Sequence, residues 1–240
     1  MSCAPSTSLS LRRVAMFSVH SCPLAPLGGR ETGGMNVYVR ELSRLLGQQD
    51  IAVDVYTRRQ DPWEPTVVNF GPRARVIHLH AGPAAPYAKH RVWDHLPEFV
   101  EGVLAFATSQ DLHYDLLHSH YWLSGWVALQ LRQLWSVPMV HMSHTLGYPK
   151  NAAAQQVWEQ EPPRRLQVEY EILKYSDALQ QTAYGAGVRC RSSPGADYSL
   201  RRGYCAVSSP EPAAGTTCPG LAGGCTPGTL CGAIAAFKRT

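Results

Sequence analysis

Polar side chains that can carry chemistry follow several short apolar runs of the sequence. Six of them share this position: His20, His118, His120, His141, His144 and Thr145. An imidazole can donate or accept hydrogen bonds, move protons near neutral pH and bind metals. A single histidine at the end of a strand is more often structural, but several at successive strand ends, together with a glycine pair, favour a functional site.

The glycine pair is Gly33-Gly34, which precedes a helical pattern of apolar residues from Met35 to Leu46. Backbone N–H groups at the start of a helix can face an anion, and glycine allows a ligand to approach the backbone closely. The alternative interpretation is that these glycines only let the chain turn.

Apolar periodicity places the remaining elements. Strands are expected near 14–19, 51–56, 75–80, 115–119 and 137–141, helices near 35–46, 94–107, 123–134 and 164–175, and loops at 57–72, 143–147 and 150–161. Strands that alternate with helices predict an α/β fold with a doubly wound, Rossmann-like, mostly parallel sheet. Ligands of such sheets bind beyond the carboxyl ends of the strands, where the histidines gather.

The chain is expected to divide into a disordered leader at 1–11, one α/β domain at 12–182 and a low-complexity tail at 183–240. The tail holds five of the seven cysteines and few large apolar residues, so it lacks the apolar area to offset the entropy of ordering. We predict that it is disordered and interpret it as the product of a frameshift. The alternative is a natural cysteine-rich tail with a binding role.

Composition narrows the classes of function. The net charge is +4 and no block of lysines and arginines indicates a nucleic-acid partner. Apolar runs are shorter than the ~18 residues of a membrane span, and the N-terminus lacks the pattern of a secretory signal. A cytoplasmic location is therefore expected. The cysteine spacings contain no C-x₂-C pair, which argues against a zinc module.

Three segments carry a resemblance to a known family: VHSCPLAPLGGRETGGMNVYVREL, YDLLHSHYWLSGWVA and VPMVHMSHTLGYPKN. They resemble the N-terminal domain of GT-B-fold retaining glycosyltransferases of family 4. Within that family the likeness is to the D-inositol-3-phosphate glycosyltransferases and the sucrose-phosphate synthases. The resemblance extends roughly from Arg12 to Ala178.

The resemblance implies the transfer of a sugar from a nucleotide sugar, such as a UDP- or GDP-sugar, to a hydroxyl of a phosphorylated polyol or sugar. It implies retention of anomeric configuration and no metal or other cofactor. Carried over by position, His144 and His20 face the reacting sugar, and Gly33 and Gly34 lie near the donor phosphates. The residues implied to bind the acceptor are Asn36, Lys89, Tyr121, Thr145 and Arg164.

The sequence departs from the family after the strand expected near Ala178, because no second α/β domain with the nucleotide-binding residues follows. We therefore expect this form of the chain to be inactive. One alternative is a non-catalytic sugar-phosphate-binding half-domain. Another is a metal hydrolase built on His118-x-His120 and His141-x-x-His144, although no acidic residue adjoins them. The donor sugar, the acceptor and homodimer formation are left open.

Overall fold

The centre of the molecule is one mixed β-sheet. The computed structural model describes residues 11–26, 33–86, 88–181, 186–190 and 206–207. The strands lie in the order β3-β4-β2-β1-β5-β6-β7-β8-β9. Their bounds are β1 (Arg13–Phe17), β2 (Ala52–Arg58), β3 (Val67–Gly71), β4 (Ala74–Leu79), β5 (Leu116–His120), β6 (Met139–Met142), β7 (Ala178–Gln181), β8 (Ala186–Cys190) and β9 (Ala206–Val207).

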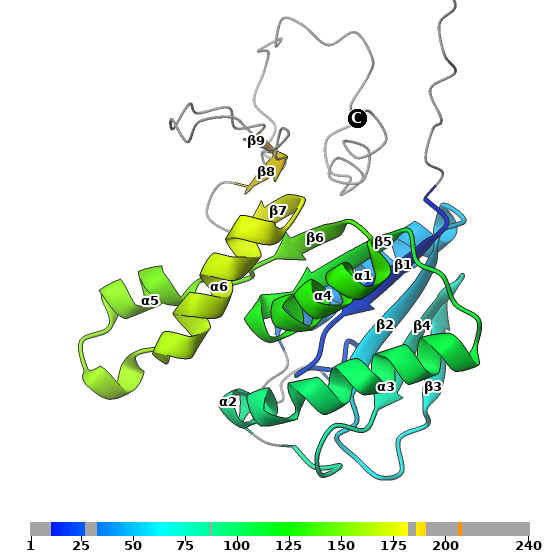
Figure 1. Ribbon diagram of the computed structural model, residues 1–240, viewed down its shortest axis with the longest axis horizontal. Coiled ribbons are helices and arrows are strands. Elements are labelled where there is room, and N and C mark those ends of the chain that lie inside the picture. The colour runs from blue at the N-terminus through cyan, green and yellow to red at the C-terminus, as the bar shows by residue number, and fades with distance from the viewer. Residues whose placement is uncertain (1–10, 27–32, 87, 182–185, 191–205, 208–240) are drawn as a thin grey trace, which may run out of the picture.

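Helices cover both faces of the sheet. They are α1 (Gly34–Gln48), α2 (Lys89–Val92), α3 (Leu96–Ser109), α4 (Tyr121–Trp135), α5 (Gly147–Ala153) and α6 (Pro163–Tyr175), with 3₁₀ turns η1 (Trp93–His95) and η2 (Val157–Glu159). Helices α3 and α4 lie over one face, and α5 lies beside α6 (Figure 1). Among the residues that the structure describes, no helix combines the length and the apolar character needed to cross a membrane.

The alternation of β1 divides the core into two layers. Val14 and Met16 pack in one apolar cluster with residues of α1, such as Val39. Ala15 and Phe17 pack in the other cluster with residues of α3, α4 and α6. Successive side chains of a strand point to opposite faces, so α1 covers one face and the other three helices cover the other.

Strands β4, β2, β1, β5, β6 and β7 pair in parallel, which confirms the predicted doubly wound α/β fold. The chain leaves β1 toward β2 on one side of the sheet and later returns to β5 on the other side. The strand order therefore reverses between β1 and β5. This is the place where a crevice for a ligand is expected.

Two segments predicted to be loops contain regular structure. The first is 57–72, where β3 pairs antiparallel with β4 at the edge of the sheet. Periodicity did not reveal this edge strand. Prolines flank it at positions 65 and 72, and its side chains are exposed or partly exposed, so no alternation of apolar and polar residues marks it. The second is 150–161, which contains the end of α5 and the whole of η2, and α5 begins at the last residue of the loop predicted at 143–147.

The structure describes only part of the predicted tail. Within it, β8 pairs antiparallel with β7, and β9 pairs antiparallel with β8. These two short strands differ from the predicted absence of regular structure. The rest of the tail, and the leader up to residue 10, lie outside the described residues.

Candidate active site

The ends of β1, β5 and β6 bring predicted site residues together. The ring of His20, which follows β1, lies 4.8 Å from the ring of Tyr121, the first residue of α4. His120 ends β5, and its Nδ1 lies 3.0 Å from Nε2 of His144. The two residues predicted to face the reacting sugar, His20 and His144, therefore lie at the same edge of the sheet, next to the point where its strand order reverses.

Burial keeps these two histidines uncharged near neutral pH. It lowers the pKa of His20 to about 3, with further lowering by the charges of Lys89, His144 and Arg165. Burial also lowers the pKa of His144 to about 4. A neutral imidazole can exchange hydrogen bonds with a sugar hydroxyl but carries no charge and is a weak base at such a pKa. Nδ1 of His20 has no hydrogen-bond partner among the described residues.

Three further histidines, on β5 and β6, are buried inside the fold. The rings of His118 and His120 lie 4.3 Å apart, and Nδ1 of His141 lies 2.8 Å from Oγ of Ser119. Burial lowers the pKa of His118 and of His141 to about 3 and that of His120 well below its ordinary value. In the described part of the chain, no group of three or more histidine, cysteine or acidic side chains is arranged to hold a metal ion.

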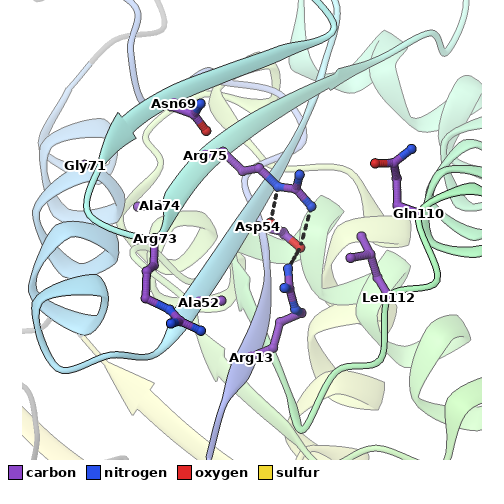
Figure 2. A pocket seen from close by; sticks show the side chains of 10 residues that line it. All are labelled: Arg13, Ala52, Asp54, Asn69, Gly71, Arg73, Ala74, Arg75, Gln110 and Leu112. Carbon is purple, nitrogen blue, oxygen red and sulfur yellow. Dashed lines mark hydrogen bonds and ion pairs between the residues drawn. The ribbon is translucent and has the colours of Figure 1, made fainter.

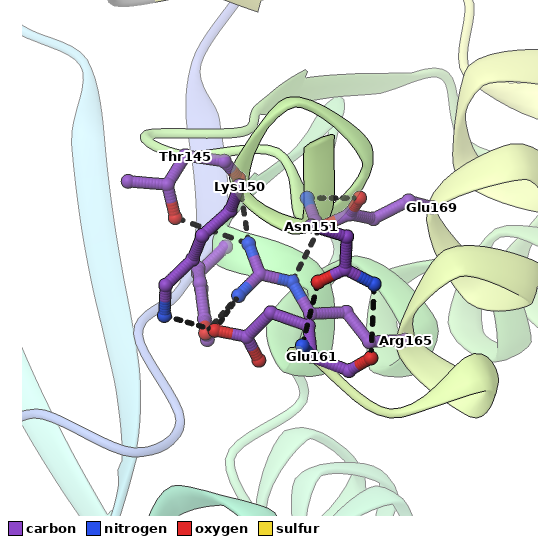
Figure 3. Close-up of polar contacts among 8 residues, drawn as sticks. Thr145, Lys150, Asn151, Glu161, Arg165 and Glu169 are labelled. Carbon is purple, nitrogen blue, oxygen red and sulfur yellow. Dashed lines mark hydrogen bonds and ion pairs between the residues drawn. The ribbon is translucent and has the colours of Figure 1, made fainter. Parts of the chain in front are cut away.

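A buried arginine connects two of the predicted acceptor-binding residues. Arg165 on α6 donates from Nη1 to the hydroxyl of Tyr121 at 2.8 Å. Its Nη2 donates to the carbonyl oxygen of Thr145 at 3.0 Å and to Oγ1 of Thr145 at 3.1 Å. Figure 3 shows this guanidinium at the centre of its polar contacts. The hydroxyl oxygens of Tyr121 and Thr145 each accept a hydrogen bond from Arg165. The proton of each hydroxyl can therefore be donated to a ligand.

Two glutamates balance the charge of Arg165. Its Nε donates to Oε1 of Glu169 at 2.7 Å, and Nη1 lies 2.9 Å from Oε1 of Glu161. Glu161 also pairs with Lys150 of α5, and Oε2 of Glu169 accepts the N–H of Gly147 at 2.8 Å. Each nitrogen of the Arg165 guanidinium thereby has at least one partner, and α5 is held to α6 beside Tyr121.

The two predicted cationic residues lie in different surroundings. Nζ of Lys89, at the start of α2, is 5.7 Å from the centre of the Tyr121 ring. Arg164 is exposed, and its guanidinium carbon lies 5.2 Å from the centre of the Trp93 ring. Lys89 therefore borders Tyr121, whereas the neighbour of Arg164 in the sequence, Arg165, makes the contacts to Tyr121 and Thr145. The sequence analysis missed Arg165, although carboxylates four residues before and after it signal a helical ion-pair face.

The glycine pair opens onto free space at the start of α1. A Cβ placed on Gly33 or on Gly34 meets no atom of the described residues within 4 Å. Asn36 instead points into the fold, where its Nδ2 donates to Oγ of Ser21 at 2.7 Å and to the carbonyl oxygen of Cys22 at 2.6 Å. Its Oδ1 accepts the N–H of Gly33 at 3.3 Å. Asn36 thus ties the loop after β1 to the start of α1.

Two of the site residues have left-handed backbone angles. The φ of Tyr121 is +72° and that of His144 is +55°. Such angles are uncommon outside glycine and are strained for a bulky residue, so surrounding contacts must hold them. At Tyr121 the hydrogen bond from Arg165 and its stacked position under the guanidinium, 4.7 Å from the ring centre, supply such contacts.

The chain is similar in sequence to curated glycosyltransferases. The D-inositol 3-phosphate glycosyltransferase of Corynebacterium jeikeium is 42% identical over 167 residues, which are 70% of this chain and 40% of that protein. The enzyme of the same name from Kineococcus radiotolerans is 43% identical over 173 residues, 72% of this chain and 40% of that protein. The chain therefore spans about 40% of the length of these curated relatives.

A solved structure shares the fold. The sucrose-phosphate synthase of Thermosynechococcus elongatus superposes with a TM-score of 0.66 at 38% identity, over 70% of this chain and 41% of that one. The family described as glycosyl transferase 4-like domain matches residues 33–183, from the glycine pair to the end of the parallel sheet. The chain belongs to the glycosyl transferase 4-like domain family.

Proposed function

We propose that this domain binds the acceptor in the transfer of a sugar from a nucleotide sugar to a hydroxyl of a phosphorylated polyol or sugar. The relatives named for D-inositol 3-phosphate support an inositol phosphate as the first acceptor to test. The observation that carries the proposal is the cluster of Lys89, Tyr121 and Thr145 around the buried Arg165.

The cluster has the chemistry to hold a phosphate. Lys89 supplies a cation at the ring of Tyr121, and the hydroxyls of Tyr121 and Thr145 supply donors. Each guanidinium nitrogen of Arg165 already has a partner, so the role of Arg165 in the proposal is to position these two hydroxyls. A phosphate held here lies next to His20, whose ring contacts Tyr121. Hydrogen bonds between a cation and phosphate are about twice as strong as neutral ones.

The donor is proposed to approach from the start of α1. Gly33 and Gly34 leave open space there, and the positive end of the helix dipole favours phosphate. His144 and His20, both uncharged, would accept or donate hydrogen bonds at the reacting sugar. We propose a UDP- or GDP-sugar as donor and retention of configuration, as the family resemblance implies.

Calorimetric titration tests the acceptor site. D-inositol 3-phosphate should bind at least tenfold more tightly than unphosphorylated inositol. Lys89→Gln should weaken the binding of the phosphate about tenfold, because a hydrogen bond to a charged group contributes about 1.5–3 kcal/mol. Lys174→Gln, which removes the same charge from the far end of α6, is the matched control and should change nothing.

The outcomes separate the alternatives. Equal affinity for inositol and its phosphate, or no effect of Lys89→Gln, would overturn the proposed phosphate grip. A chain that binds the phosphate and also forms a glycoside from a UDP- or GDP-sugar is a transferase, and NMR of the product gives its anomeric configuration. Binding without any product supports the non-catalytic sugar-phosphate-binding half-domain.

A further inference from the structure

A hollow lies at the amino-terminal edge of the sheet, opposite the candidate active site. Its volume is about 590 Å³, and three arginines and one carboxylate line it, namely Arg13, Arg73, Arg75 and Asp54. Figure 2 shows Arg13 and Arg75 at Asp54, with Arg73 on one side of them and Gln110 and Leu112 on the other. The lining belongs to the starts of β1, β2 and β4, to β3 and the turn that joins it to β4, and to the segment just after α3. The candidate active site lies at the other end of these strands.

The sheet register places the charges together. Asp54 on β2 is the direct partner of Arg75 on β4, and Arg13 begins the adjacent strand β1. Oδ1 of Asp54 accepts from Nε of Arg75 at 2.6 Å, and Oδ2 accepts from Nη1 of Arg13 at 2.9 Å. The hydroxyl of Tyr114 donates to Oδ2 at 2.9 Å. One buried carboxylate thus receives two guanidinium groups, which leaves one positive charge uncompensated.

A third guanidinium adds to this excess. Nη1 of Arg73 lies 2.9 Å from Oδ1 of Asp50, which is outside the hollow and exposed. An exposed ion pair of this kind contributes little, so Arg73 can turn toward a ligand at small cost. With three arginines and one carboxylate, the formal charge of the lining is +2.

Small residues leave room for a ligand between these groups. The side chains of Ala52 and Ala74 and the backbone of Gly71 line the hollow, and the amides of Asn69 and Gln110 add neutral hydrogen-bonding groups. A volume of this size suits a small metabolite. The combination of small walls, amides and surplus guanidinium groups is suited to an oxyanion, which arginine binds in a two-pronged geometry.

We propose that this hollow binds a small phosphate monoester at a site separate from the candidate active site. A phosphate monoester carries close to two negative charges at neutral pH, which matches the +2 of the lining. The phosphate lies against Arg73 and the outer faces of Arg13 and Arg75, and the organic part lies against the alanines. A ligand here stabilises the arrangement of β1, β2 and β4 from the end of the strands opposite to the sugar chemistry.

A ¹H–¹⁵N NMR titration of the whole chain with glycerol 3-phosphate tests the site. Glycerol, and sodium chloride at matched ionic strength, serve as blanks. The backbone amides of Arg73, Arg75 and Gln110 should shift and saturate with the phosphate ester alone. Arg73→Gln should weaken this binding about three- to fivefold, as expected for the loss of one exposed charge contact. Lys174→Gln should leave it unchanged.

A second variant keeps the test decisive. Gln110→Glu places a carboxylate on the rim and should weaken binding further without removing a partner of Asp54. The proposal would be overturned if these amides show no saturating shifts. It would also be overturned if Arg73→Gln and Gln110→Glu both bind glycerol 3-phosphate as tightly as the unchanged chain. Shifts at Lys89 and Thr145 report the acceptor site in the same spectra, so failure of one site is distinguished from failure of the other.

Discussion

The two edges of the sheet hold buried charges of opposite arrangement. At the carboxyl edge a buried cation, Arg165, lies between the carboxylates of Glu161 and Glu169. At the amino edge a buried anion, Asp54, lies between the guanidinium groups of Arg13 and Arg75. The same ion-pair chemistry therefore serves two purposes. At the carboxyl edge the paired charges hold the hydroxyls of Tyr121 and Thr145 in place. At the amino edge they leave positive charge at the surface.

The difference lies in which partners reach water. The side chains of Glu161 and Glu169 are 10% and 8% exposed, whereas those of Arg13 and Arg75 are 30% and 24% exposed. Removal of Arg165 would leave the carboxylates of Glu161 and Glu169 unpaired where little water reaches them. Removal of Asp54 would leave arginines that can still contact solvent. The two edges also differ in their histidines. Those whose pKa is lowered by burial lie at the carboxyl edge.

Acidification should give the largest effect and act through the carboxyl edge. The folded-state pKa values of His118, His120 and His141 lie below the ordinary value, so the unfolded chain binds more protons as the pH falls. Their contribution to stability is complete above about pH 6.5 and is lost toward pH 3. Between pH 6.5 and 4.5 His118 and His141 should each remove about 2 kcal/mol from the free energy of unfolding, and the lowered pKa of His120 adds a loss in the same direction.

Urea unfolding at a series of pH values measures this loss. His118→Gln removes one titrating group and should reduce the loss by about 2 kcal/mol. A free energy of unfolding that stays level between pH 6.5 and 4.5 would contradict the assignment of neutral, desolvated histidines to this edge.

Removal of the buried arginine should come next. Arg165→Met should lower the free energy of unfolding by about 3–5 kcal/mol, because Glu161 and Glu169 lose their buried partner. Asp54→Asn is the mirror-image control at the amino edge and should cost about 1–2 kcal/mol, since its arginines can turn toward water. Thermal and urea unfolding of both variants at pH 7.5 make the comparison. Equal costs would show that exposure of the partners does not govern the two clusters.

The smallest effect contrasts two glycines of α1. A Cβ on Gly47, near the end of the helix, would lie 1.6 Å from the carbonyl oxygen of Pro72, in the turn that carries Arg73. Gly47→Ala should therefore cost about 1–3 kcal/mol through overpacking against backbone. Gly34→Ala, at the other end of α1, meets open space and should be neutral or slightly stabilising. Unfolding measurements that rank the two variants in the reverse order would refute this assignment of the glycines.

Neighbouring residues show where prediction from the sequence succeeds and where it stops. Strand and helix periodicity located the parallel strands and the edge where His20 and His144 lie together. The family resemblance implied Arg164 as an acceptor-binding residue, whereas the structure places Arg165 against Tyr121 and Thr145. Adjacent residues of a helix point about 100° apart, so Arg164 and Arg165 occupy different sides of α6, one beside Trp93 and the other beside Tyr121.

Local patterns in the sequence determined the fold class, the approximate elements and the gathering of histidines at strand ends, because alternation and helical spacing are short-range properties. Contacts between distant segments were decided by the tertiary structure alone. The partners of Arg165 come from α4, from α6 itself and from the segments just before α5 and just before α6, and those of Asp54 come from β1, β4 and the segment before β5. Whether such a charge is buried, paired or open to a ligand depends on the packing of elements that are far apart along the chain.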